Sequence, residues 1–480
     1  MFSIESTLTS KGVGEPLTTW QSPRRTRALT VSLLTLLLCL GLWWAYESVI
    51  SPSFSYFLYT YNAPPFLTTF AAIGMVIGIG LLMPRSIERP SAVIYWIIFV
   101  IVVIPVSVIP ELLLGGILSS TTSRQLLLDQ LILNACFVGI GLLLRLPPPR
   151  VQLFRMPART FWPIVFSIMF ILYVILLGAT GLHQVPSLSE IYTTRAAYKS
   201  SLAGSSGAAY ASTWLANVFN PLLITCGVAS RRIYMIAMGV AGQLLIYSVS
   251  GEKAALFSTG LLLVVSYILS PKRRFAFGRN ILFGTGCVVF VSLAVDRLLG
   301  GQMWTSIFSR RFLVTPSFLT GVYFDFFSHN PHAHLGTGIL SGIVSSPYTQ
   351  DPASVIGHYL YPQGTDNANV NLFGDAFANF GHWGMLIFSL LFAAFLLLID
   401  GASRERDVRF TSMFLVMIAL SWTQSALFTT LLTGGALLAL IILFVLPSES
   451  DLGLDAAWSS PSSVEGALSK PSSVGLFRSN

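Results

Sequence analysis

Long apolar runs without charge recur along the sequence, and they limit the chain to a small set of folds. A helix that crosses the roughly 30 Å hydrocarbon layer of a membrane needs about 20 largely apolar residues. Runs such as "LTVSLLTLLLCLGLWW" are apolar on every face, which favours helices over the alternating strands of a barrel. Because 54% of the residues are hydrophobic and only 10% are charged, we predict an all-α, polytopic integral membrane protein.

About twelve membrane-spanning helices are expected. Their approximate ranges are 28–46, 66–83, 92–109, 126–146, 161–179, 211–229, 233–248, 255–270, 281–299, 382–400, 410–424 and 434–446. The first run is too long for a cleaved signal peptide, and no small-x-small site follows it, so we expect it to remain as a span. The predicted transmembrane bundle covers residues 28–447, while the Ser-, Pro- and Gly-rich segments 1–27 and 448–480 are expected to be disordered.

The basic residues indicate how the bundle is oriented. Lys and Arg accumulate on cytoplasmic loops, and a cytoplasmic N-terminus puts "RRTR", "RSIER", "KRRFAFGR" and "RERDVR" on that side, together with the C-terminus. The net charge of +8 is therefore interpreted as a topology signal, and no nucleic-acid partner is expected. Two long segments then face outward, 180–210 and 300–381, the second between spans nine and ten. Long loops that persist usually carry function, so we expect any chemistry there.

Missing motifs restrict the kind of chemistry. The sequence has no G-x-x-x-x-G-K-S/T loop, no strand-linked G-x-G-x-x-G and no Asp-rich magnesium motif. The energy for a reaction must therefore come with the substrate, as it does in a sugar linked to a lipid pyrophosphate, and no cofactor is expected. All four cysteines fall inside predicted spans, so no disulfide framework is expected either.

Cations in the two outward segments, and in the tight turn between the spans at 233–248 and 255–270, are candidate ligands of such a pyrophosphate. They are Arg195, Lys199, Lys253, Arg310 and Arg311. Arg195 and Lys199 are four residues apart and would share one helix face, while Arg310 and Arg311 open the longer segment. Two structural alternatives stay open. Arginines at span ends often anchor helices to lipid phosphates, and Lys253 can form an ion pair with Glu252 at a helix end.

Carboxylates, histidines and amides in the longer segment are candidates for catalysis and sugar binding. The candidate bases are Asp375, His329 and Asp325, and the candidate sugar-binding residues are Tyr323, Asn367, Asn369, Asn371 and Asn379. The alternative is structural, because Asn or Asp at a helix start caps backbone amides. A metal site is not expected, because Pro331 interrupts the histidines of "HNPHAHLG" and no carboxylate cluster completes a ligand set.

Three stretches together resemble the oligosaccharide repeat-unit polymerases, the O-antigen polymerase family of bacterial inner membranes. They are "IYTTRAAY", "SRRFLVTPSFLTGVYFDFFSHNP" and "NANVNLFGDAFANFGHWG", and the resemblance covers about residues 160–400. The arginine-then-glycine loop pattern of that family fits Arg310 and Gly321, whereas Gly204 and Gly207 miss this spacing after Arg195.

The resemblance implies a metal-independent, inverting glycosyltransferase with a C-type glycosyltransferase-like bundle in the inner membrane. It would move a growing glycan from undecaprenyl pyrophosphate to the non-reducing sugar of an incoming undecaprenyl-pyrophosphate-linked repeat unit. The implied partners are these lipid-linked oligosaccharides, membrane lipids and a membrane protein that regulates chain length.

Two alternatives are kept. The related O-antigen ligase, which transfers the glycan to lipid A core, shares the donor. A flippase or transporter predicts ionisable residues at mid-membrane and internal repeats, and apart from the polar residues Asp129 and Asn134 in the fourth span the sequence shows neither.

Overall fold

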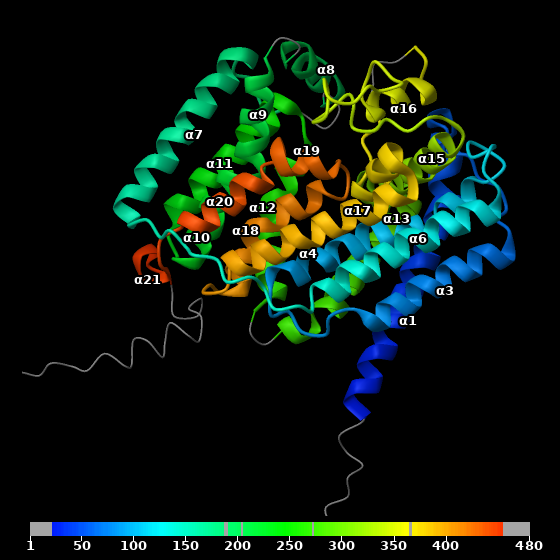
Figure 1. Cartoon of the computed structure of the whole chain (residues 1–480), viewed down its shortest axis with the longest axis horizontal. Helices are drawn as coiled ribbons and strands as arrows, with labels where there is room; N and C mark the ends of the chain where they lie inside the picture. Colours follow the sequence, from blue (N-terminus) through cyan, green and yellow to red (C-terminus); the bar gives the residue numbers. More distant parts are fainter. Residues whose placement is uncertain (1–21, 187–190, 203–204, 271–272, 364–366, 455–480) are drawn as a thin grey trace, which may run out of the picture.

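The computed structural model describes residues 22–186, 191–202, 205–270, 273–363 and 367–454 (Figure 1). Within these residues all regular secondary structure is helical, as the apolar runs predict. The first part contains α1 (Ser22–Ala45), η1 (Tyr46–Ile50), α2 (Ser51–Phe54), η2 (Ser55–Phe57), α3 (Phe66–Leu82), α4 (Pro90–Ile98), η3 (Phe99–Val103), α5 (Ile104–Val106), η4 (Pro110–Leu113) and α6 (Ser123–Leu143).

The middle of the chain carries the next set of helices. They are α7 (Ala158–Thr180), α8 (Ile191–Leu202), α9 (Ser206–Trp214), η5 (Leu215–Phe219), α10 (Asn220–Ala229), α11 (Ile233–Ser250), α12 (Lys253–Ile268), η6 (Arg274–Ala276) and α13 (Phe277–Leu299). The last part contains α14 (Met303–Thr305), η7 (Ser306–Val314), α15 (Thr315–His329), α16 (Pro352–Leu360), α17 (Leu372–Ala402), α18 (Val408–Ser421), α19 (Leu427–Leu432), α20 (Ala436–Val445) and α21 (Glu449–Leu452).

Eight helical stretches of the described chain are long and apolar enough to cross a membrane. They are Ala28–Phe57, Pro90–Leu113, Ser123–Leu143, Ala158–Thr180, Ile233–Ser250, Arg274–Leu299, Leu372–Ala402 and Leu427–Val445. Three more expected spans correspond to the shorter apolar helices α3, α12 and α18, and the one expected at 211–229 is divided among α9, η5 and α10. The chain is therefore a multi-pass membrane protein, and the number of twelve spans stays a prediction.

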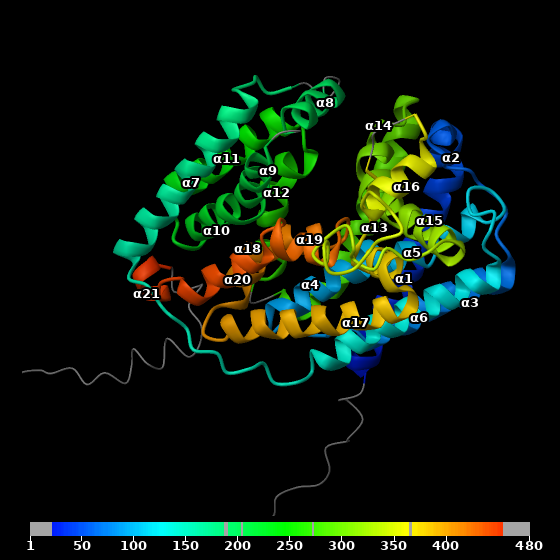
Figure 2. The ribbon, with the colours of Figure 1, turned by 45° about the horizontal axis from the view of Figure 1, so that its top comes forward.

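The helices form two groups connected by α4, α17 and α18. In one group α1 packs against α3 and α13, and in the other α10 packs against α11; α18 contacts α4, α10 and α12. In both views α8 and α16 lie on the same side of the bundle, whereas the start of α1 and α21 lie on the opposite side (Figures 1 and 2). The two segments expected to face outward therefore reach the same end of the molecule.

The longer outward segment is mostly helical and continues into α17. Asn371 caps α17, since its Oδ1 accepts hydrogen bonds from the amides of Phe373 (3.0 Å) and Gly374 (3.2 Å). The helix thus begins ten residues before the predicted start of the span at 382. A kink at Phe380 and Gly381 lies close to that predicted start and separates the first turns from the rest.

Packing around this kink requires glycine. Gly381 has φ +59°, and a Cβ there would stand 3.1 Å from His332 Nε2. At Gly384 a Cβ would collide with the carbonyl oxygen of Ala376. Next to the kink, His382 Nε2 and Asp129 Oδ1 form a hydrogen bond of 2.7 Å, which supplies a partner for an ionisable residue inside the bundle.

Candidate functional site

The turn between α11 and α12 is where the two segments expected to face outward meet. Gly251 ends α11 in the left-handed conformation, at φ +63°, and Glu252 is the residue before α12. From α8, Arg195 Nε donates a hydrogen bond to the Gly251 carbonyl oxygen (3.2 Å). Arg195, one of the predicted cations, therefore connects the segment at 180–210 to this turn.

Glu252 stands between cations that come from both segments. Part of its side chain is accessible to solvent, but protein surrounds the carboxyl group. This burial raises the pKa of the Glu252 carboxyl, while the charges of Arg195 and Arg311 act to lower it. Lys253, at the start of α12, is close enough to Arg195, Arg311 and Arg310 to feel their charges. Arg195 and Arg311 thus act on the Glu252 carboxylate, and Arg310 acts on the neighbouring Lys253. Four of the five predicted phosphate-binding cations lie around this turn, and we call Glu252 with these four residues the outer charge cluster.

The fifth predicted cation lies on the same helix as Arg195. Lys199 is exposed in the last turn of α8, four residues after Arg195. At that spacing the two side chains are neighbours on the helix surface. Lys199 therefore extends the positive face of α8 beyond the outer charge cluster.

Arg310 and Arg311 are adjacent but have different surroundings. Both lie in the π-helix η7, a form that occurs often at functional sites. The Arg310 guanidinium stands 4.3 Å from the ring centroid of Phe54 and donates from Nε and Nη2 to Ser306 Oγ (3.1 and 2.9 Å). Arg311 is exposed and interacts electrostatically with Glu252. Arg310 is thus held against aromatic rings, and Arg311 is presented toward the cluster.

A cavity of about 450 Å³ lies beside the outer charge cluster. It is formed by the end of α7, the segment after it, α8 and the end of α11, and its polar lining includes Thr180, His183, Gln184, Thr194, Tyr198, Ser201 and Ser248. Tyr198 connects the cavity to the cluster: burial raises the pKa of its hydroxyl to about 12, and the negative charge of Glu252 adds to this rise. At neutral pH Tyr198 is therefore a hydrogen-bond donor, and hydroxyls around an aromatic ring suit a sugar.

Asp375 lies in a second group of polar residues, at the start of α17. Asn379 Nδ2 donates to its Oδ1 (3.2 Å) and to its backbone carbonyl (2.9 Å), and Asp351 and Tyr323 lie within electrostatic range. The Tyr323 hydroxyl donates to the Ala368 carbonyl (2.9 Å) and is buried. In this conformation Asp375 is thus engaged within its own helix and with its neighbours.

The asparagines proposed as sugar ligands divide into two kinds. Asn371 and Asn379 are buried: Asn371 caps α17 and donates to Thr320 Oγ1 (2.7 Å), and Asn379 Oδ1 accepts from the Leu335 amide (2.8 Å). Asn367 and Asn369 are exposed, and Asn367 Oδ1 accepts from a serine hydroxyl. The exposed pair is the one that a sugar can reach from solvent.

The remaining candidate bases lie on α15. Asp325 is buried, and its Oδ1 has no hydrogen-bond partner within the described structure. His329 is exposed, with Nδ1 2.9 Å from the backbone carbonyl of Asp325. In the part of the chain that is described, no group of three or more His, Cys, Asp or Glu side chains is arranged to hold a metal ion.

The sequence pattern left Tyr198 and His183 unassigned, and it gave Glu252 as the partner of Lys253 in an ionisable pair without assigning it a role of its own. The signal for Glu252 was present, since an ionisable pair in a tight turn between two apolar runs is unusual. Its position between the two outward segments depends on how α8, α12 and η7 pack.

Comparison with known proteins found a match for the region that contains most of these residues. Residues 223–424 match the family model described as "Putative O-antigen polymerase". No curated protein and no solved structure matches the chain. The matched region includes Glu252, Lys253, Arg310, Arg311 and Asp375, and Arg195 lies outside it.

Proposed function

From the similarity of residues 223–424 to the O-antigen polymerases, which agrees with the resemblance of the two later sequence stretches, we propose that the protein polymerises lipid-linked oligosaccharide repeat units on the outer face of the inner membrane. The growing glycan is transferred from undecaprenyl pyrophosphate to the non-reducing sugar of an incoming lipid-linked repeat unit. Both termini then lie in the cytoplasm. The observation that supports this proposal most is the outer charge cluster, because a pyrophosphate leaving group needs several cations near the head of a lipid.

The cations of the cluster stabilise the departing pyrophosphate. Arg195 and Arg311 come from different segments, and guanidinium groups bind phosphate oxygens in pairs of hydrogen bonds. Lys253 adds a point charge at the N-terminal end of α12, where the first backbone amides of a helix also favour an anion. Electrostatic stabilisation of this kind is usually the largest contribution to catalysis.

Glu252 is the best-placed general base. The acceptor hydroxyl attacks the anomeric carbon, the bond from that carbon to the pyrophosphate oxygen breaks with its electron pair, and the hydroxyl proton passes to the Glu252 carboxylate. Attack opposite to the leaving group inverts the anomeric centre, and the reaction needs no metal. A bound pyrophosphate raises the proton affinity of Glu252 further because it adds negative charge beside it. Asp375, His329 and Asp325 are kept as alternative bases.

The cavity beside Tyr198 is the proposed site for the acceptor sugar. It lies next to Glu252 and carries hydroxyl groups and an aromatic ring, and its volume lies within the range of about 300–1,000 Å³ that is usual for ligand pockets. The longer outward segment, with exposed Asn367 and Asn369, would contact sugars further along the glycan.

The test is reconstitution of the purified chain in liposomes with a synthetic undecaprenyl-pyrophosphate-linked repeat unit. Polymerisation gives a ladder of products that differ by one repeat, and Glu252→Gln should remove it, whereas Arg297→Ala, an exposed arginine at the end of α13, should not. Transfer to a lipid A core acceptor without a ladder would identify a ligase. Movement of the lipid-linked unit across the bilayer without any new glycosidic bond would identify a flippase.

A further inference from the structure

A second charged cavity lies at the opposite end of the bundle. Its walls come from the turn before α4, the segment between α6 and α7, and the turn from α17 into α18, and its volume is about 370 Å³. Arg409, the neighbour of Val408 in the cavity wall, donates from Nε to the Ser266 carbonyl near the end of α12 (2.8 Å), and the helix from Lys253 at its start to Ser266 spans about 20 Å. This cavity is therefore well separated from the outer charge cluster and takes no part in the reaction proposed there.

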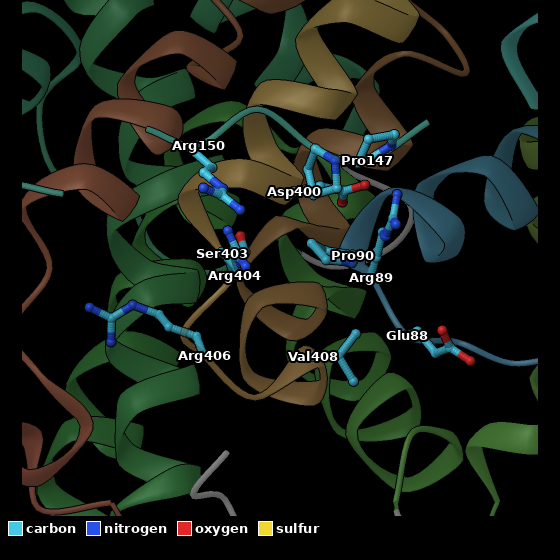
Figure 3. A pocket seen from close by; sticks show the side chains of 11 residues that line it. Glu88, Arg89, Pro90, Pro147, Arg150, Asp400, Ser403, Arg404, Arg406 and Val408 are labelled. Carbon is cyan, nitrogen blue, oxygen red and sulfur yellow. The ribbon is translucent and has the colours of Figure 1, made fainter. Parts of the chain in front are cut away.

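Four arginines line this cavity: Arg89, Arg150, Arg404 and Arg406. Only two carboxylates, Glu88 and Asp400, line it with them. Asp400 is bound by the Ser91 amide (3.0 Å) and the Ser91 hydroxyl (2.6 Å), and Glu88 accepts a hydrogen bond from Ser86 (2.9 Å). Figure 3 shows Glu88 at the edge, away from Asp400 and Arg150. The lining is thus positively charged on balance, which favours an anion.

Two of these arginines are fixed by backbone carbonyl groups. Arg89 Nη1 donates to the carbonyls of Leu144 (3.1 Å) and Leu146 (2.8 Å), where α6 ends. Arg406 is buried and donates from Nη2 to the carbonyls of Leu446 and Pro447. Carbonyl groups orient a guanidinium without neutralising its charge. The other two arginines, Arg150 and Arg404, are exposed at the edge of the cavity.

The cavity also contains a polar atom that lacks a partner. Ser403 is 4% exposed, and its Oγ has no hydrogen-bond partner within the described structure. A buried hydroxyl without a partner is costly. Because this Oγ is shielded from solvent in the present conformation, its side chain would turn toward the cavity to donate to a ligand oxygen there.

We propose that this cavity is a phosphate-binding site that holds the headgroup of an anionic phospholipid. Guanidinium groups and a hydroxyl are the donors that phosphate oxygens prefer. The cavity lies at the ends of the apolar helices α4, α6 and α17, at the level where headgroups meet water. Leu142 and Leu146 are exposed beside it on and just after α6, and they offer apolar surface to acyl chains. A free phosphate would meet the same donors but would not use this surface.

The experiment measures binding by the purified full-length protein in a neutral detergent, by native mass spectrometry and by thermal shift. The probes are short-chain phosphatidylglycerol, short-chain phosphatidylcholine, glycerol 3-phosphate and inorganic phosphate. The variants are Arg150→Ala combined with Arg404→Ala, Ser403→Ala, and Arg279→Ala as control. Arg150, Arg404 and Arg279 are all exposed, and Arg279, at the start of α13, does not line the cavity.

We expect phosphatidylglycerol to bind the unaltered protein and to raise its thermal stability more than phosphatidylcholine does. The double arginine variant should lose at least about tenfold in affinity, since each hydrogen bond from a charged donor contributes substantially. Ser403→Ala should lose less, and Arg279→Ala should bind normally. Binding of glycerol 3-phosphate or inorganic phosphate as tight as that of the lipid would keep the phosphate site but assign it to a soluble ligand. Equal binding by the double variant and the control would overturn the proposal.

Discussion

Arg310 and Arg311 are adjacent in sequence, but the structure predicts different consequences when each is replaced. Arg311 is exposed and within electrostatic range of Glu252, so in the proposed reaction it faces the leaving group. At an effective dielectric constant of about 20, a charge about 5 Å from a phosphate charge contributes about 3 kcal/mol. Arg311→Ala should therefore slow glycan transfer by about 150-fold. Arg311→Lys should recover part of that rate, because an ammonium group cannot make paired hydrogen bonds to phosphate.

Arg310 acts mainly through packing. Its guanidinium contacts the Phe54 ring at 4.3 Å and also lies 5.9 Å from the ring centroids of Phe57 and Tyr59. A desolvated cation–π contact contributes about 2 kcal/mol. Arg310→Ala should therefore lower thermal stability in detergent and reduce the transfer rate of the folded protein by less than about tenfold, which corresponds to 1.4 kcal/mol.

The assay for both residues is single-turnover transfer in liposomes at equal amounts of folded protein, with melting temperature measured in parallel. Arg297→Ala serves as the matched control for loss of an exposed positive charge at the outer end. Equal rate losses for the alanine variants of Arg310 and Arg311, or a full rate for Arg311→Ala, would refute the division of roles.

Four further predictions concern the base, the metal, the kink and the orientation. Glu252→Gln should slow transfer by about 10²–10⁴-fold. Burial raises the pKa of the Glu252 carboxyl, so the charged carboxylate destabilises the folded protein; this penalty is absent at acidic pH and grows as the pH rises through that pKa. Glu252→Gln should therefore not lower the melting temperature at neutral pH, and a large fall in melting temperature would make the residue structural. Transfer should survive EDTA, and an activity lost with EDTA but restored by zinc or magnesium would revive a metal site. Gly381→Ala should lower the melting temperature, because φ +59° with ψ −143° costs a non-glycine residue about 1–3 kcal/mol and the added Cβ meets His332. An unchanged melting temperature would argue against the kink. In a cysteine-free background, Ser206→Cys and Gln363→Cys should react with an impermeant thiol reagent in spheroplasts and Arg279→Cys should not; the reverse pattern would invert the orientation.

The local sequence pattern was sufficient to predict which segments form helices, but it predicted the ends of those helices less well. Uncharged apolar runs predicted helices at α1, α4, α6, α7, α11 and α13, because such runs can satisfy their backbone in a membrane only as helices. At α17 the same reasoning placed the start at 382, near the kink, and missed the first turns from Leu372. Those turns carry Asp375 and Asn379, whose polarity lowers the apolar signal, and their helical state depends on the cap at Asn371 and on packing against α15.

For the candidate site, too, the sequence predicted some features and left others to the tertiary structure. The sequence by itself determined that the chain is a multi-pass helical membrane protein, that Arg195, Lys253, Arg310 and Arg311 lie between its apolar runs, and that residues 223–424 resemble an O-antigen polymerase. Hydrophobicity and charge are properties of single residues and short windows, so they can be recognised without a fold.

Only the tertiary structure decided which of these residues meet. Glu252 became the centre of the outer charge cluster because α8 and η7, far apart in the chain, both reach the turn before α12. Asn371 instead caps α17, and Asp375 lies in the first turn of that helix, where it accepts a hydrogen bond from Asn379. The cationic cavity near Asp400 likewise joins three segments that are distant in sequence. Such meetings follow from helix packing over the whole bundle, which no short stretch of sequence encodes.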